Sequence, residues 1–248
     1  MLIPYEIDKN FVFILNMTNN ICLIPARAGS KRIKNKNIKT FLGKTFLRRV
    51  IETAKKSKIF DKIYVSTDSI IIKNLAEKYG AEVPYLRSQK LSNDHAILKS
   101  VIDDFFKKMM LIKKKENLNI FMIYPTSIFV NKKLIEKCKK ILKNTEYVTT
   151  VKKFPHPIQR ALKYHKNKLK PVNLKHKLMR TQDLKEHYYN TGQIDCFKSK
   201  AWIKKKMFHK MFSKFIILNE FESVDIDTPN DLKMAYKLFK IKKKLSKF

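Results

Sequence analysis

The sequence predicts an α/β protein of three layers (α/β/α), in which helices cover both faces of a mostly parallel sheet. Short apolar runs of strand length alternate along the chain with segments of helical periodicity, and this alternation is typical of parallel strands joined by helices. The 248 residues, 44% of them hydrophobic, are enough for one large domain with a substantial core.

The first half of the chain carries this alternation most clearly. Short continuous apolar runs predict buried strands, and longer amphipathic stretches predict helices. Gly80 suits the C-terminal cap of the second helix, and Pro84 indicates that the third strand lies at an edge. The elements expected, in order, are strand 21–26, helix 46–58, strand 62–67, helix 69–79, strand 81–87 and helix 97–112.

The second half resumes the alternation after one interruption. Residues 155–200 contain Pro155, Pro157 and Pro171 and no long helical pattern, so they are interpreted as an insertion that covers the site or forms a subunit contact. The elements expected around it are strand 119–127, helix 131–143, strand 146–154, strands 215–219 and 223–227, and a helix that begins near Thr228.

The two ends of the chain are assigned outside the domain. Residues 1–20 are interpreted as an N-terminal extension, 21–240 as a single domain and 241–248 as a basic tail. The apolar run 11–15 is too short to cross a bilayer and no small-residue cleavage site follows it, so neither a membrane span nor a signal peptide is expected.

The composition leaves two interpretations of a formal net charge of +34. A nucleic-acid-binding protein would use lysines for phosphate contacts, whereas a general compositional bias would enrich Lys along with Asn, Ile, Phe and Tyr. The lysines are spread evenly along the chain, which favours the bias, and no nucleic-acid partner is expected. Three distant cysteines without a C-x-x-C motif indicate neither zinc nor disulfides and suit the reducing cytoplasm.

A cationic loop follows the first strand. It contains Arg27, Lys31, Arg32 and Lys36 around Gly29, but matches neither common phosphate-binding fingerprint. In a parallel sheet, ligands bind beyond the carboxyl ends of the strands. The loop should therefore share one rim with the other segments that follow strands, namely Thr67-Asp68, Arg87 and Thr126-Ser127.

A pair of carboxylates lies near the C-terminus, in the segment SVDIDTPNDL. Asp225 and Asp227 are two residues apart, so on an extended chain their side chains point to the same side. Two like charges held together favour a cation between them, and Mg²⁺ takes one or two carboxylates with water and phosphate oxygens. The alternative is that acids simply mark the start of the helix; we accept it for Asp231 and favour metal binding for the pair.

The cationic loop and the carboxylate pair together predict nucleotidyl transfer. Attack on the α-phosphorus of a nucleoside triphosphate builds negative charge on the phosphoryl oxygens and on the departing pyrophosphate, and fixed cations with Mg²⁺ neutralise it. Gly29 and Ser30 allow the backbone to approach the phosphates and to donate hydrogen bonds.

These motifs carry a family resemblance. IPARAGSKRIKNKNI, VSTD, YPTS and DIDTPNDL, in this order over residues 20–240, resemble the cytidylyltransferases that activate eight- and nine-carbon sugar acids as CMP-sugars. HPIQRAL, RTQDL and YYNTGQ look most like the pseudaminic acid branch, and the N-acetylneuraminic and legionaminic acid branches are close siblings. The resemblance implies a nucleotide-diphospho-sugar transferase (Rossmann-like) fold, CTP and a nonulosonic acid as substrates, Mg²⁺, and a homodimer.

The resemblance also assigns roles to particular residues. Lys36, Asp225 and Asp227 fall at catalytic positions, the two aspartates as the magnesium ligands. The positions expected to bind the nucleotide are Arg27, Ala28, Gly29, Ser30, Lys31, Asn37, Arg87, Thr126 and Ser127. The positions expected to face the sugar are Gln159, Arg160, Arg180, Gln182 and Gln193.

Two features of the sugar-facing segment keep alternatives open. Arg180 could instead form an ion pair with Asp183 or Glu186. In addition, the chain has Ile194, Asp195 and Cys196 where the pseudaminic acid branch prefers aromatic residues, and Asn190 replaces an expected Asp. These departures leave the identity of the nonulosonic acid open.

Overall fold

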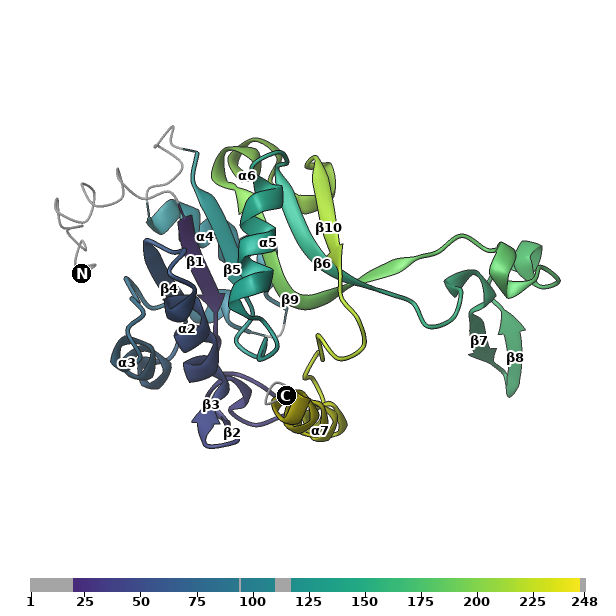
Figure 1. The fold of residues 1–248 in the computed structure, drawn as a ribbon, viewed down its shortest axis with the longest axis horizontal. Helices are drawn as coiled ribbons and strands as arrows, with labels where there is room; N and C mark the ends of the chain where they lie inside the picture. Colours follow the sequence, from purple (N-terminus) through teal and green to yellow (C-terminus); the bar gives the residue numbers. More distant parts are fainter. Residues whose placement is uncertain (1–19, 94, 110–116, 246–248) are drawn as a thin grey trace.

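The structure, a computed structural model, describes residues 20–93, 95–109 and 117–245. At its centre is a six-stranded sheet with the order β10-β6-β9-β5-β1-β4 (Figure 1). Five of the strands run parallel, and β9 alone is antiparallel to its neighbours β5 and β6, so the predicted α/β class is confirmed. The strands are β1 (Asn20–Pro25), β4 (Lys62–Ser66), β5 (Asn119–Ile123), β6 (Tyr147–Lys153), β9 (Tyr188–Lys198) and β10 (Ser213–Ile217).

Helices cover both faces of the sheet. On one face, α2 (Phe46–Ser57), α3 (Ile70–Lys78) and α5 (Lys132–Leu142) pack on an aliphatic core. On the other face, α4 (Leu98–Lys108) and α6 (Ser199–Lys205) pack on a core rich in aromatic side chains. The side chains of Thr45, Ser69 and Asn131 cap α2, α3 and α5 by accepting a hydrogen bond from a backbone N–H in the first turn, which fixes where these helices begin.

A third, smaller core joins the two ends of the domain. The last helix α7 (Pro229–Leu245) packs against the hairpin of β2 (Thr40–Phe41) and β3 (Lys44–Thr45). The shared side chains include Phe41, Ile226 and Ala235, all buried. Because Ile226 lies between the two aspartates, this core fixes the carboxylate pair beside the cationic loop.

An arm projects from the sheet between β6 and β9 (Figure 1). It carries the hairpin of β7 (Leu162–His165) and β8 (Lys168–Pro171) and several short 3-10 turns. Its apolar side chains have few neighbours: Leu174 is 75% exposed and Leu178 is 93% exposed. The irregular arm spans 154–187, so it ends earlier than the expected limit of residue 200.

Several expected elements were wrong. The predictions missed β9 because its polar residues, among them Asn190, Gln193 and Asp195, hide the apolar pattern of a central strand. Residues 223–227 have no regular secondary structure and pair with no described strand. Residues 81–87 make only two isolated bridges, Tyr64 with Glu82 and Thr67 with Leu86.

Other predictions concern the ends of elements. Of residues 1–20, expected as an extension, Asn20 begins β1 instead, and 1–19 lie outside the described residues, as do the end of the helix expected at 97–112 and the last three residues of the tail. The rest of the tail continues α7 to Leu245. No helix in the described ranges has the length and apolar character needed to span a membrane.

Candidate active site

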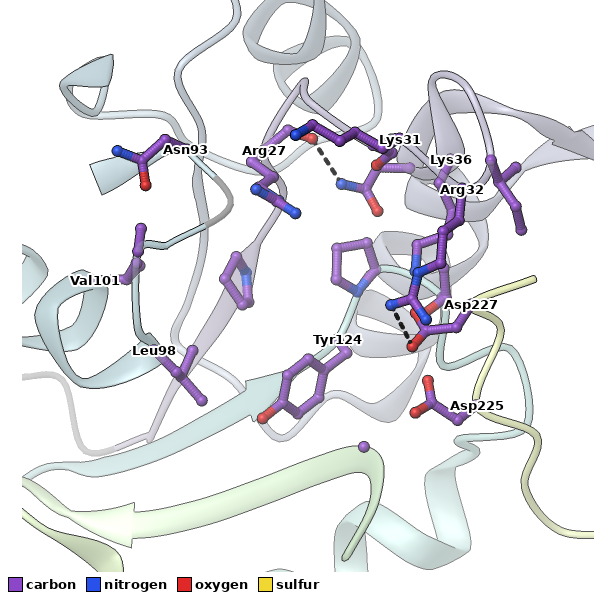
Figure 2. A pocket seen from close by; sticks show the side chains of 18 of the residues that line it. Arg27, Lys31, Arg32, Lys36, Asn93, Leu98, Val101, Tyr124, Asp225 and Asp227 are labelled. Carbon is purple, nitrogen blue, oxygen red and sulfur yellow. Dashed lines mark hydrogen bonds and ion pairs between the residues drawn. The ribbon is translucent and has the colours of Figure 1, made fainter. Parts of the chain in front are cut away.

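A cavity of about 480 Å³ opens beyond the carboxyl ends of β1 and β5 (Figure 2). The cationic loop forms one side, and the carboxylate pair approaches it from the chain after β10. Tyr124, directly after β5, forms part of the wall between them. The predicted residues that line this cavity are Arg27, Ser30, Lys31, Lys36, Asn37, Arg87, Thr126, Asp225 and Asp227.

Other predicted nucleotide-binding positions support the loop or the wall without lining the cavity. The N–H of Ala28 donates to Asp68 Oδ1 at 2.9 Å, and its side chain packs on the core. A Cβ on Gly29 would meet no atom within 4 Å, so the backbone there stays open to a ligand. Ser127 is buried and donates to the carbonyl of Gln193 at 2.8 Å.

Two lining residues are themselves held by hydrogen bonds. Asn37 Nδ2 donates to the carbonyl of Arg27 at 2.8 Å, which closes the loop on itself. Arg87 is 5% exposed, and its Nε donates to Ser92 Oγ at 3.0 Å. Burial lowers the pKa of Arg87, and the charge of Asp68 acts in the opposite direction. Both side chains therefore present fixed polar groups to the cavity.

The carboxylate pair has the geometry that the sequence predicts. Ile226 is fully buried, and the side chains of Asp225 and Asp227 both face the cavity. Asp231 belongs to the start of α7 instead, because its Oδ2 accepts from the N–H of Thr228 at 2.7 Å and Thr228 Oγ1 accepts from the N–H of Asp231 at 3.3 Å. The helix-start interpretation therefore holds for Asp231.

The segment that carries the pair is held by side chains instead of by a sheet. Lys152 Nζ donates to the carbonyl of Ser223 at 2.8 Å. Gln193 Nε2 donates to the carbonyl of Val224 at 3.3 Å, and Lys36 Nζ to that of Ile226 at 2.7 Å. Gln193, expected to face the sugar, is 2% exposed and thus acts in this support. These three contacts replace the ladder bonds that a strand would have supplied.

The sequence did not single out Lys152, because no local pattern distinguishes it from the many other lysines of the chain. Its side chain is 7% exposed, and the hydrogen bond it donates to Ser223 is buried. We expect Lys152→Met to lower the free energy of unfolding by about 1–3 kcal/mol, because the buried carbonyl of Ser223 and the half-buried carbonyl of Glu220 lose their donor. Urea denaturation measures this. Lys153→Met, at the exposed neighbouring position, is the matched control and should leave the midpoint nearly unchanged; equal effects of the two variants would contradict the assignment.

The two carboxylates differ in their partners. Asp227 Oδ1 accepts from Lys36 Nζ at 2.9 Å, and Asp227 Oδ2 accepts from Arg32 at 2.8 Å (Figure 2). Asp225 accepts no hydrogen bond from the described part of the chain, and the backbone of Gly192, at φ +61, passes close to it. Burial, and then the charge of Asp227, raise the pKa of Asp225. Burial also acts to raise the pKa of Asp227, but Lys36 and Arg32 outweigh it and lower that pKa.

These opposite shifts predict how stability depends on pH. Because the pKa of Asp225 is raised in the folded state, its ionisation costs stability as pH rises above its ordinary value of 3.8 and through the folded value. Asp225→Asn should therefore unfold at a higher urea concentration than wild type near pH 7, and this gain should shrink as pH falls toward 3.8. Urea titrations of both proteins between about pH 7 and pH 4 measure it; a gain independent of pH would contradict the argument.

The donor set fits Mg²⁺. Two carboxylates in a cavity with room for phosphate oxygens and water match the coordination that Mg²⁺ prefers. Asp225 would be the ligand with no competing hydrogen bond from the described residues. Both oxygens of Asp227 are already in ion pairs, so Asp227 could bind a metal only by breaking one of them. The ion pair with Arg32 is the weaker of the two, because the Arg32 side chain is 65% exposed.

The remaining residues expected to face the sugar lie on the arm and do not line the cavity of the same chain. Gln159 Nε2 donates to the carbonyl of Lys185, and Arg160 donates to Thr181 Oγ1 at 3.2 Å. Arg180 pairs with Asp183 at 2.8 Å, which is the alternative the sequence left open, and Gln182 is exposed. Their role toward the sugar stays a prediction.

A cationic loop facing two carboxylates across a cavity at the carboxyl edge of this sheet defines the site of a nucleotidyltransferase. The chain belongs to the cytidylyltransferase family, whose model matches residues 21–243. It is thus an enzyme, a cytidylyltransferase, as the sequence predicts.

Similar proteins agree with this assignment. The chain is 34% identical to a pseudaminic acid cytidylyltransferase of Campylobacter jejuni over 227 residues, which cover 90% of this chain and 97% of that protein. It is 33% identical to a CMP-N,N'-diacetyllegionaminic acid synthase of Legionella pneumophila, over 89% of this chain and 96% of the relative. A solved CMP:2-keto-3-deoxy-manno-octonic acid synthetase complexed with CTP shares the fold, with a TM-score of 0.62 at 13% identity over 90% of this chain and 99% of that one.

Proposed function

We propose that this enzyme transfers CMP from CTP to pseudaminic acid and releases pyrophosphate. The observation that carries the proposal is the single cavity in which Lys36 of the cationic loop lies beside the Asp225 and Asp227 carboxylates. The similarity to two pseudaminic acid cytidylyltransferases supports the choice of sugar.

Each side of the cavity has a part in the reaction. Arg27, Lys31 and Arg87 supply positive charge for the triphosphate, and the anomeric hydroxyl of the sugar attacks the α-phosphorus. The new bond joins that oxygen to phosphorus as the bond to pyrophosphate breaks, and the hydroxyl proton is released to solvent. Mg²⁺, held by Asp225 and Asp227, would neutralise charge on the phosphate oxygens. Lys36, held by the Ile226 carbonyl and Asp227, would stabilise charge that develops on the α-phosphoryl group.

The experiment is a pyrophosphate-release assay with CTP, Mg²⁺ and a panel of pseudaminic, legionaminic and N-acetylneuraminic acids. We expect turnover with pseudaminic acid to exceed that with the other two. The 33% identity to the legionaminic acid synthase makes legionaminic acid the second candidate. Turnover restricted to another nonulosonic acid would reassign the substrate, and no turnover with any sugar acid would overturn the proposed function.

We further propose a homodimer in which the arm of one subunit reaches the cavity of the other. The arm exposes Leu174 and Leu178, and it carries Arg160 and Arg180 away from the cavity of its own chain. A planar guanidinium is well suited to a sugar carboxylate. Light scattering should give a mass near twice 29.5 kDa. Mixing inactive Arg160→Ala with inactive Asp225→Asn subunits should restore turnover, and a monomeric active enzyme would contradict the proposal.

A cytoplasmic location is also part of the proposal. The three cysteines are free and buried, which suits a reducing compartment, and CTP is a cytoplasmic metabolite.

A further inference from the structure

A buried carboxylate on β9 has no part in the mechanism above. Asp195 is 2% exposed and accepts four hydrogen bonds. Its Oδ2 accepts from the Tyr124 hydroxyl at 3.0 Å, and its Oδ1 accepts from the Tyr147 and Thr149 hydroxyls, both at 2.6 Å, and from Asn190 Nδ2 at 3.2 Å. Burying a carboxylate is costly unless donors surround it, and four donors match its accepting capacity.

This carboxylate lies directly behind the cavity wall. Of its four donors, Tyr124 and Asn190 line the cavity. The neighbouring Ile194 and Cys196 point to the opposite face of the sheet, into the aliphatic core. Of the three departures from the pseudaminic acid branch at 194–196, only Asp195 therefore acts on the site.

The network fixes which hydrogen-bonding groups the wall offers to a ligand. The Tyr124 hydroxyl donates its hydrogen bond to Asp195, so only the lone pairs of the Tyr124 oxygen remain available to a ligand. Burial, and then the charge of Asp195, raise the pKa of Tyr124, which keeps the hydroxyl protonated. Asn190 Nδ2 gives its two hydrogens to Thr149, at 2.8 Å, and to Asp195, and its Oδ1 accepts from the Gly192 N–H at 2.7 Å. Both side chains can therefore only accept.

We propose that Asp195 is a positioning residue for the sugar, which makes Tyr124 and Asn190 acceptors for its hydroxyl or amide N–H groups. A carboxylate or phosphate, which offers no hydrogen, is disfavoured at this wall. The sugar therefore binds with its donors toward Tyr124 and Asn190 and its carboxylate toward the cations on the other side of the site. This inference rests on the proposed function, because it assigns an orientation to the sugar substrate.

The test compares Michaelis constants for the two substrates. Asp195→Asn keeps the shape of the side chain but gives Tyr124 an amide that can donate to it. We expect the KM for the sugar to rise about tenfold, the effect of losing one hydrogen bond of about 1.4 kcal/mol, while the KM for CTP changes less than about twofold. Tyr124→Phe, which removes the accepting oxygen, should raise the sugar KM similarly. The double variant should show no further rise, because both changes act on one contact.

Tyr147→Phe separates positioning from structural support. Tyr147 also donates to Asp195, but it is outside the cavity lining. We expect it to lower the thermal midpoint without a selective change in the sugar KM. If wild type turns over but Asp195→Asn raises both KM values equally, or changes only the thermal midpoint, the positioning role is overturned while the proposed function stands. If wild type binds CTP in calorimetry but turns over no sugar acid, both are overturned.

Discussion

Asp225→Asn is expected to lower turnover on the order of a thousandfold while the protein remains folded. The carboxylate faces the cavity, accepts no hydrogen bond from the described residues and has a raised pKa, so its charge contributes nothing favourable to the free protein. Such a group is suited to a ligand, and loss of the proposed Mg²⁺, which would stabilise several kcal/mol of transition-state charge, costs about three powers of ten in rate. Pyrophosphate release at saturating CTP and sugar measures the loss.

Asp227→Asn is the matched comparison. Turnover should fall as steeply, but this variant should also lose stability, since Lys36 and Arg32 lose their partner and the pKa of Asp227 is lowered in the folded protein. The two variants thus distinguish an effect on metal binding from an effect on folding. Both should lose turnover to the same extent, but their urea midpoints should shift in opposite directions. Turnover within tenfold of wild type in Asp225→Asn, across a magnesium titration, would falsify the metal assignment.

The sequence was sufficient for those parts of the fold that local pattern determines. The strands predicted at 21–26, 62–67 and 119–127 contain short apolar runs, and helices α2, α3 and α5 follow Thr45, Ser69 and Asn131, residue types that favour helix caps. The loop after β1 was placed on one rim with Thr67-Asp68, Arg87 and Thr126-Ser127 because parallel strands end at the same edge. The cavity confirms that Lys36 and Asp225 lie together.

The parts that the sequence did not predict depend on contacts between distant residues. β9 is a central strand in which polar side chains such as Gln193 and Asp195 are buried, so its hydrophobicity does not report its burial. The 223–227 segment looked like a strand, yet its carbonyls are satisfied by Lys152, Gln193 and Lys36. The Asp195 network joins residues up to 71 positions apart, and no spacing rule reports it.

The same contacts show why the loop and the carboxylates act as one unit. Lys36 is the link, since its ammonium donates both to the Ile226 carbonyl and to Asp227. Its side chain is only 20% exposed, whereas that of Arg32 is 65% exposed. Lys36 is therefore held in place between the loop and the carboxylates, whereas the exposed Arg32 can change its position when a ligand binds.

Lys36→Gln is accordingly expected to reduce kcat by about 10²–10³-fold with a much smaller change in the KM for CTP. A preorganised charge aimed at the reacting phosphoryl group acts mainly in the transition state, and removing one such donor has an effect of this size. Arg32→Gln is the matched control: it removes an exposed cation from the same carboxylate and should lower kcat less than about tenfold. Single-turnover formation of CMP-sugar separates chemistry from product release. If Lys36→Gln raises the KM for CTP while kcat is unchanged, Lys36 serves only to bind the nucleotide, and charge stabilisation must come from other groups, namely the proposed Mg²⁺ and the arginines.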